Sequence, residues 1–200
     1  MDEFACTVTR LTSADGGDGV RLTLADFPDG KGHTLTISAD DFLAMRIARG
    51  AMDADTLAAV TEAAGRYAAL RAAIRMLGAG QCSRRRLYEK LRARRITDAD
   101  ATFAVDTVYA KGYIDEDWQL RSYIRTLTAQ KQYGPRKLYA ALAAKGYRGD
   151  DIRRAMDENF GAEEIRAARR VFLEKKFGKT APETRDEAAA MRQALYKQGF

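Results

Sequence analysis

The chain reads LYEKLRARRI at residues 87–96, LYAALAAKGY at residues 138–147 and MRQALYKQGF at residues 191–200. The equivalent leucines of these three lines are 51 and 53 residues apart. A period of this size is typical of a repeated helical unit, which buries its apolar face partly against its neighbours. We therefore expect the function to reside on an extended surface.

Helix caps and stops lie on both sides of the first line. One helix ends at Gly78, a second is capped by Ser83, and a third is capped by Thr97 or Asp98 and stops at Gly112. Ser, Thr and Asp satisfy the free N–H groups of a helix start, and glycine suits a helix end. These residues predict a unit of three helices.

The second line has the same surroundings. Gly134-Pro135 opens its helix, because proline in the first turn loses no hydrogen bond, and Asp150 or Asp151 would cap the next helix. The third line follows a break at residues 178–182, and we expect its unit to lack the last helix.

The N-terminal residues alternate between apolar and polar types, as strands do. Three strands are expected at residues 7–12, 20–24 and 34–37, with turns at 15–19 and 28–32. A sheet this small needs a helix over its apolar side to be stable.

Two helices should link this sheet to the first unit. Ser38 would cap one helix, which would stop at Gly50. The other would start near Asp53 or Asp55 and continue or bend at Gly65.

The fold class predicted is mainly α, with about three tandem three-helix repeats, the last incomplete, behind a small β-rich segment. The boundaries would be an acidic N-terminal segment at 1–62, repeats at 63–117 and 118–162, and an incomplete repeat at 163–200.

Composition favours a soluble cytoplasmic protein. Hydrophobic residues make up 46% of the 200 residues, enough for a core, and no apolar run reaches the ~20 residues of a membrane span. The start, Met1-Asp2-Glu3-Phe4, lacks a signal-peptide pattern. Cys6 and Cys82 have no metal-ligand spacing, so we expect unpaired thiols.

The net charge of +6 is unevenly distributed. Residues 1–62 hold 5 Lys/Arg against 11 Asp/Glu, and residues 63–200 hold 29 against 17. Basic repeats favour a polyanion or an acidic protein surface as partner, although solvated helix faces are also rich in arginine.

Several motifs of the repeats are similar to those of a known family. They are GYIDE at 112–116, YIR at 123–125, YGPRKL at 133–138 and KGY at 145–147, preceded by SRRRL at 83–87. In these motifs the chain resembles the RecX regulators of the bacterial recombinase RecA. It differs at Trp118-Gln119-Leu120, where the family usually has an aromatic-alanine pair.

The resemblance implies a non-catalytic modulator. RecX-like proteins bind RecA and its filament on DNA and inhibit ATP hydrolysis, strand exchange and filament growth, which modulates recombination, DNA repair and the SOS response. Some also bind DNA by themselves, so single- or double-stranded DNA is a second expected partner. We expect a monomer without cofactor, metal or membrane contact; filament capping and groove binding remain alternatives.

The surface that binds RecA or DNA should be formed by cations of the first two repeats. The first repeat carries the densest group, and the second offers equivalent positions. The candidates are Arg84, Arg85, Arg86, Lys90, Arg92, Arg121, Arg125, Lys131, Arg136, Lys137 and Lys145.

The sequence contains little that would support a catalytic or metal site. His33 is the only histidine, so a Ser/His/Asp or Cys/His set is not available, and we expect it on the surface. Asp115-Glu116-Asp117 suits helix capping better than a metal.

Two other readings stay open. Short three-helix units with a basic second helix resemble helix-turn-helix modules, so the protein could bind DNA without RecA, or it could be a helical scaffold for another protein. The acidic segment 1–62 could also dock on the basic repeats as an internal competitor.

Overall fold

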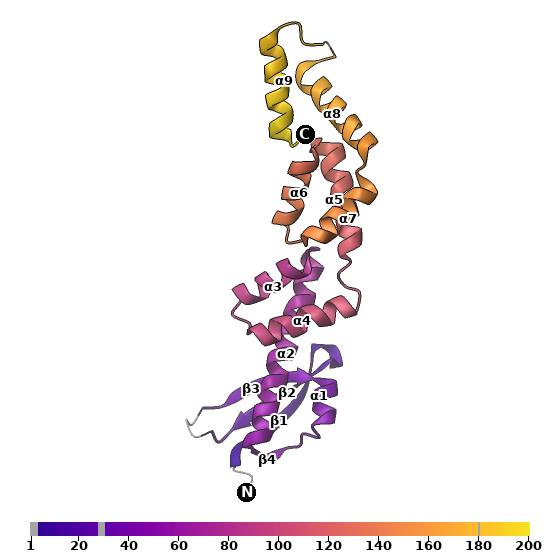
Figure 1. Ribbon diagram of the computed structural model, residues 1–200. Coiled ribbons are helices and arrows are strands. Elements are labelled where there is room, and N and C mark those ends of the chain that lie inside the picture. The colour runs from indigo at the N-terminus through magenta and orange to yellow at the C-terminus, as the bar shows by residue number, and fades with distance from the viewer. Residues whose placement is uncertain (1–3, 28–30, 180) are drawn as a thin grey trace. The chain divides into compact units, whose positions relative to one another are not determined.

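The computed structural model describes residues 4–27, 31–179 and 181–200. The predicted fold class is confirmed: most described residues are helical, and a small antiparallel sheet lies near the N-terminus (Figure 1). Among the described helices, none has both the length and the apolar character needed to cross a membrane. Outside the described residues lie residues 1–3, 28–30 and 180, which belong to the predicted N-terminal segment, second turn and helix break.

Contacts within the chain define two compact units. The first unit contains the residues up to Gly80 together with Leu87–Lys111, and the second contains Gln81–Arg86 together with Gly112–Phe200. The division into segments 1–62, 63–117, 118–162 and 163–200 stays a prediction.

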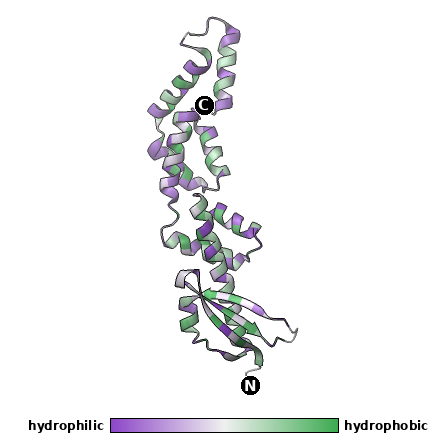
Figure 2. Cartoon of the chain, turned by 180° about the vertical axis from the view of Figure 1, so that it is seen from behind, coloured by the Kyte–Doolittle hydropathy of each residue, from purple (hydrophilic) through white to green (hydrophobic). Residues whose placement is uncertain are grey.

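The sheet of the first unit has four antiparallel strands in the order β3-β2-β1-β4. They are β1 (Phe4–Ala14), β2 (Gly19–Ala25), β3 (His33–Ser38) and β4 (Gly50–Asp53), with a 3-10 turn, η1 (Asp15–Gly17), between β1 and β2. Figure 2 shows hydrophobic and hydrophilic residues mixed along these strands, as expected when one face packs in a core.

Two expectations for this region are wrong. The prediction of three strands missed β4, and Gly50 does not end a helix: α1 (Ala39–Ala44) stops earlier, and Gly50 begins β4 opposite Val8. β4 has only four residues and exists because the free edge of β1 pairs with it, which local alternation cannot indicate. Ser38 does cap α1, its hydroxyl accepting a hydrogen bond from the backbone N–H of Asp41 at 3.0 Å.

Helix α2 (Ala54–Ala79) covers the apolar side of the sheet, as predicted. Asp53 caps it by accepting a hydrogen bond from the N–H of Thr56 at 2.7 Å. The helix presents Val60 and two alanines to the core, and such small side chains let its backbone approach the strands closely. The sheet contributes Val8, Leu22, Leu24 and Ile37, all at most 2% exposed.

Gly65 lies inside α2, which continues through this position, as one of the two expectations for it had it. The helix runs through this position and packs on α4 (Asp98–Ala110), which Thr97 caps at the N–H of Asp100. A Cβ on Gly65 would lie 2.8 Å from a carboxylate oxygen of Asp100. The glycine therefore allows the two helices to approach each other.

Tyr67 attaches α2 to the turn between β1 and β2. Its side chain is 7% exposed, and its hydroxyl donates a hydrogen bond to Asp15 at 2.9 Å. Arg71, one turn further along α2, pairs with Asp15 at 3.3 Å. Burial, and then the hydrogen bond to Asp15, raises the pKa of Tyr67 to about 12.

This shift predicts an alkaline loss of stability. The neutral phenol is favoured in the folded state, so its contribution is complete below the ordinary pKa of 10.0 and is lost as the pH rises through about 12. The free energy of unfolding should fall as the pH rises over this interval. In the variant Tyr67→Phe, the free energy of unfolding should fall less steeply with pH. Urea unfolding at several pH values measures both slopes; equal slopes would contradict the prediction.

The second unit is helical in all its regular elements among the described residues. Its helices are α5 (Glu116–Lys131), α6 (Pro135–Ala144), α7 (Gly149–Asn159), α8 (Ala162–Phe177) and α9 (Arg185–Gln198). Residues from α5, α6 and α7 form the main core, to which α8 adds Ala168 (Figure 1). The most deeply buried core side chains are Leu120, Ile124, Leu138, Leu142 and Ile152.

The predicted cap of α7 is wrong. The helix begins at Gly149, and its N-cap is Arg148, two residues before Asp150; the Arg148 side chain makes no capping hydrogen bond. Asp150 and Asp151 lie in the first turn, where carboxylates favour the positive end of the helix dipole. Each pairs with the arginine three residues further along the helix.

Candidate partner-binding surface

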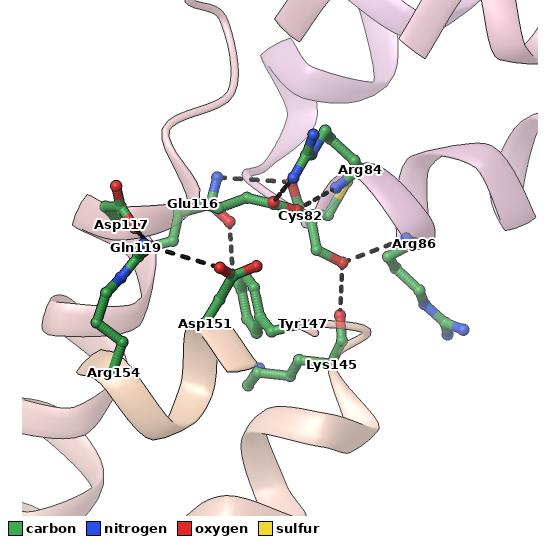
Figure 3. Close-up of polar contacts among 11 residues, drawn as sticks. Cys82, Arg84, Arg86, Glu116, Asp117, Gln119, Lys145, Tyr147, Asp151 and Arg154 are labelled. Carbon is green, nitrogen blue, oxygen red and sulfur yellow. Dashed lines mark hydrogen bonds and ion pairs between the residues drawn. The ribbon is translucent and has the colours of Figure 1, made fainter. Parts of the chain in front are cut away.

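The turn after α6 docks on the start of α3 (Arg84–Ala93), whose first three residues belong to the second unit. The Ser83 hydroxyl caps α3 by accepting from the N–H of Arg86 at 3.2 Å, and it donates to the Lys145 carbonyl at 2.8 Å (Figure 3). Gly146 has a φ of 88°, and a Cβ there would lie 2.8 Å from the Ser83 hydroxyl oxygen. This position requires glycine twice, for its backbone angle and for the close approach.

The turn after α9 docks in the same way on the start of α6. The N–H of Gly134 donates to the Gln198 carbonyl at 2.9 Å, and the N–H of Arg136 donates to the Gly199 carbonyl at 3.1 Å. Gly199 has a φ of 94°, and a Cβ there would lie 2.5 Å from the backbone nitrogen of Lys137. In both cases a glycine turn that follows the second helix of one repeat packs on the second helix of the repeat before it.

The repeated line therefore encodes a junction as well as a helix. Arg95, Gly146 and Gly199 each stand four residues after the equivalent leucine and each have a positive φ. Arg95 is exposed and has a φ of 63°. The turn itself thus tolerates arginine, and glycine stands where the turn must touch another helix.

Two polar pairs lie beside the first junction, Arg84 with Glu116 and Gln119 with Tyr147. We call these four side chains the polar node. Glu116 accepts from the backbone N–H of Arg84 at 2.8 Å and from its guanidinium at 2.8 and 2.9 Å (Figure 3). Gln119, 2% exposed, accepts from the Tyr147 hydroxyl at 2.6 Å. Burial, and to a lesser extent nearby charge, raises the pKa of Tyr147, so the phenol stays protonated as the donor.

Several predicted surface cations make contacts inside the second unit. Arg84 binds Glu116, as described, and Arg136 lies 4.1 Å from the Tyr196 ring centroid and donates to the Tyr196 carbonyl at 3.2 Å. Lys137 donates to the Gln198 side chain at 3.1 Å. Arg136 and Lys137 thus contact the segment that docks at the second junction, whereas Arg84 binds a residue beside the first junction; neither role was predicted.

Three lysines of the second unit lie over tyrosine rings. The ammonium of Lys145 is 4.2 Å from the ring centroid of Tyr123. Those of Lys137 and Lys131 are 4.6 and 5.9 Å from the ring centroid of Tyr133. Cation–π contacts of this kind stabilise exposed side chains modestly.

The predicted cations of α3 are exposed apart from Arg84, which is half-buried. Arg85 and Arg86 lie in the second unit, and Lys90 and Arg92 lie in the first. Arg92 donates a hydrogen bond to the Ile96 carbonyl.

Arg121 and Arg125 are exposed on α5, and their side chains make no hydrogen bond or ion pair with another residue that the structure describes. Trp118 precedes them at helical spacing, three and seven residues away, and is 53% exposed. These three side chains share one side of the helix, which we call the α5 face. Sequence reasoning found the arginines but missed the tryptophan, although the spacing indicates it.

The other candidate groups have structural roles. Asp115 caps α5 at the N–H of Trp118, at 2.8 Å, and Asp117 pairs with Arg154 at 2.9 Å. His33 is exposed on β3, with its ring 4.5 Å from that of Phe27. Cys6 and Cys82 are buried, and neither forms a disulfide bond with another described residue. Within residues 4–27, 31–179 and 181–200, no group of His, Cys, Asp and Glu could hold a metal ion.

The chain is similar to proteins of known family. A regulatory protein RecX from Thermus thermophilus is 34% identical over 102 residues, which are 51% of this chain and 70% of that protein. The chain belongs to the RecX family. A regulatory protein RecX from Geobacillus thermodenitrificans is 26% identical over 167 residues, or 83% of this chain, and the match spans 62% of the relative's length. No protein-family model matches the chain.

Two solved RecX structures share the fold. A regulatory protein RecX has a TM-score of 0.77 at 20% identity, over 98% of this chain and 94% of that one. RecX from Lactobacillus salivarius has a TM-score of 0.60 at 18% identity, over 68% and 88% of the two chains. These structures support the fold, and the 34% identity to the Thermus thermophilus protein confirms the predicted RecX membership.

The polar node should contribute to the stability of this RecX-family chain. Glu116→Gln removes the charge that binds Arg84, so we expect the free energy of unfolding to fall by about 1–3 kcal/mol. Asp117→Asn is the matched control, since its ion pair with Arg154 is exposed and should matter by less than about 1 kcal/mol. Urea unfolding measures both; equal effects would contradict the assignment.

Proposed function

We propose that this protein binds RecA and the RecA–DNA filament and inhibits the recombinase and its ATP hydrolysis, without catalysing a reaction itself. It would thereby modulate recombination, DNA repair and the SOS response, as a monomer in the cytoplasm. Membership of the RecX family supports the proposal, since its relatives are named regulatory proteins. The observation that supports the proposal most is the α5 face, whose three side chains are exposed and available to a partner.

The chemistry of the α5 face suits a protein interface. Tryptophan and arginine are the residues most often found where binding energy concentrates, since they bury large area and pair with carboxylates. Trp118 is half exposed, and both arginine side chains lack hydrogen-bond and ion-pair partners among the described residues. A partner that covers the tryptophan would also exclude water from the arginines and strengthen their ion pairs.

Sedimentation of RecA filaments formed on single-stranded DNA tests the binding directly. The protein should pellet with the filaments in proportion to RecA, and Trp118→Ala should reduce the amount bound. The control is Ile74→Ala, which truncates an exposed hydrophobic residue of the first unit. Absence of the unmodified protein from the pellet would contradict the proposal.

A second candidate function is DNA binding without RecA, and the same face favours it. An exposed tryptophan can stack on a base while neighbouring arginines contact phosphates. Binding to oligothymidylate should then weaken with salt. The logarithm of the binding constant should fall against the logarithm of the salt concentration with a slope of about −0.7 for each phosphate neutralised. Steep salt dependence without any effect on RecA would favour this candidate over the first.

A further inference from the structure

The ends of α2 and α3 line a groove in the first unit. It has a volume of about 540 Å³. Of its residues, only Lys90 belongs to the predicted binding surface. The lining consists of Arg75, Met76, Ala79, Lys90, Ala93 and Arg94.

Positive charge is concentrated in this groove. Arg75, Lys90 and Arg94 are exposed, and their side chains make no hydrogen bond or ion pair with another described residue. No acidic side chain is among the lining residues. Like charges around a concave surface produce a positive potential, which an anionic ligand would neutralise.

The helix dipole explains only part of this charge. Cations near the C-terminus of a helix are favourable, and Arg94 directly follows α3. However, the carbonyls of Leu91 and Arg92 already accept hydrogen bonds from the backbone N–H groups of Arg94 and Arg95. Arg75 also lies four residues before the end of α2, so the dipole does not require the three cations to line one groove.

The apolar residues of the lining favour an acidic peptide over a nucleic acid as the anionic ligand. Met76 and the two alanines can accept an aliphatic side chain, and methionine adapts readily to different shapes. No aromatic side chain lines the groove, so nucleic-acid bases would have no ring on which to stack. We propose that the groove binds an acidic peptide segment, with an aliphatic side chain on the alanines and carboxylates paired with the three cations.

This site lies within the first unit and does not depend on RecA binding. The probe is a fluorescein-labelled peptide of glutamates with one central leucine, followed by fluorescence anisotropy. Saturable binding is expected. Lys90→Glu combined with Arg94→Glu should weaken it by about tenfold or more. The control, Arg10→Glu with Arg49→Glu, makes the same charge change at exposed positions outside the groove and should leave affinity unchanged.

A second variant separates shape from charge. Ala93→Trp fills the groove without changing its charge, so it should weaken the leucine peptide more than a peptide with serine in place of leucine. Circular dichroism verifies that each variant is folded. Lack of saturable binding by the unmodified protein would overturn the proposal. So would unchanged affinity in both groove variants, or displacement of the peptide by oligothymidylate at a lower concentration than by unlabelled peptide.

Discussion

Changing the α5 face should abolish most of the inhibition of RecA. For Trp118→Ala with Arg121→Glu and Arg125→Glu, we expect the concentration that half-inhibits ATP hydrolysis to rise by about a hundredfold, equivalent to about 3 kcal/mol. The physical reason is that the variant removes the exposed ring and turns two attractive charges into repulsive ones. ATP hydrolysis by RecA on single-stranded DNA measures the effect.

The matched control changes charge on another helix of the same unit. Arg166 and Arg170 are exposed on α8, four residues apart, and their side chains make no hydrogen bond or ion pair with another described residue. Arg166→Glu with Arg170→Glu should leave inhibition nearly unchanged. If both charge-reversed proteins lose inhibition equally, overall charge rather than the α5 face is responsible.

Gly146→Ala should destabilise the fold more than any other single change discussed for this chain. A non-glycine residue at a φ of 88° is strained by about 1–2 kcal/mol, and the new Cβ would also displace the Ser83 hydroxyl from the Lys145 carbonyl. We expect the free energy of unfolding to fall by about 2–4 kcal/mol, measured by urea unfolding.

Gly112→Ala separates backbone strain from docking. Gly112 has a φ of 74°, but a Cβ there would meet no atom within 4 Å. This variant should lose only the strain, about 1–2 kcal/mol. Without the Ser83 hydroxyl, a Cβ at residue 146 has less to displace. The losses in free energy of unfolding caused by Ser83→Ala and Gly146→Ala should therefore be non-additive in the double variant. Additive effects, or equal losses at the two glycines, would contradict the junction.

Local chemistry made much of the helical part predictable. Ser83 and Thr97 begin helices because their hydroxyls accept backbone hydrogen bonds, and Pro135 lies at a helix start where its missing N–H does no harm. These signals act within one turn of chain, so a single sequence contains them.

Features that depend on distant residues were not predictable in the same way. β4 forms on the edge of β1, and Gly65 is needed because Asp100 comes close to it. The repeat was visible from its leucines, but the role of Gly146 required the position of Ser83. Each case is a contact between segments far apart in the chain, which periodicity does not specify.

In the candidate surface, too, residue type was predictable from the sequence, but contacts with distant residues were not. The basic character of Arg84 and Arg136 was evident, yet Glu116 and Tyr196 bind these two side chains within the fold. Composition identifies which residues are cations, and only the structure distinguishes the cations engaged in junctions from Arg121 and Arg125.

The proposed inhibition is tested most directly by the rate of ATP hydrolysis by RecA on single-stranded DNA as the unmodified protein is added. We expect the rate to fall in a saturable way as the protein approaches the concentration of RecA. A rate that stays unchanged when the protein is present in excess over RecA would contradict it.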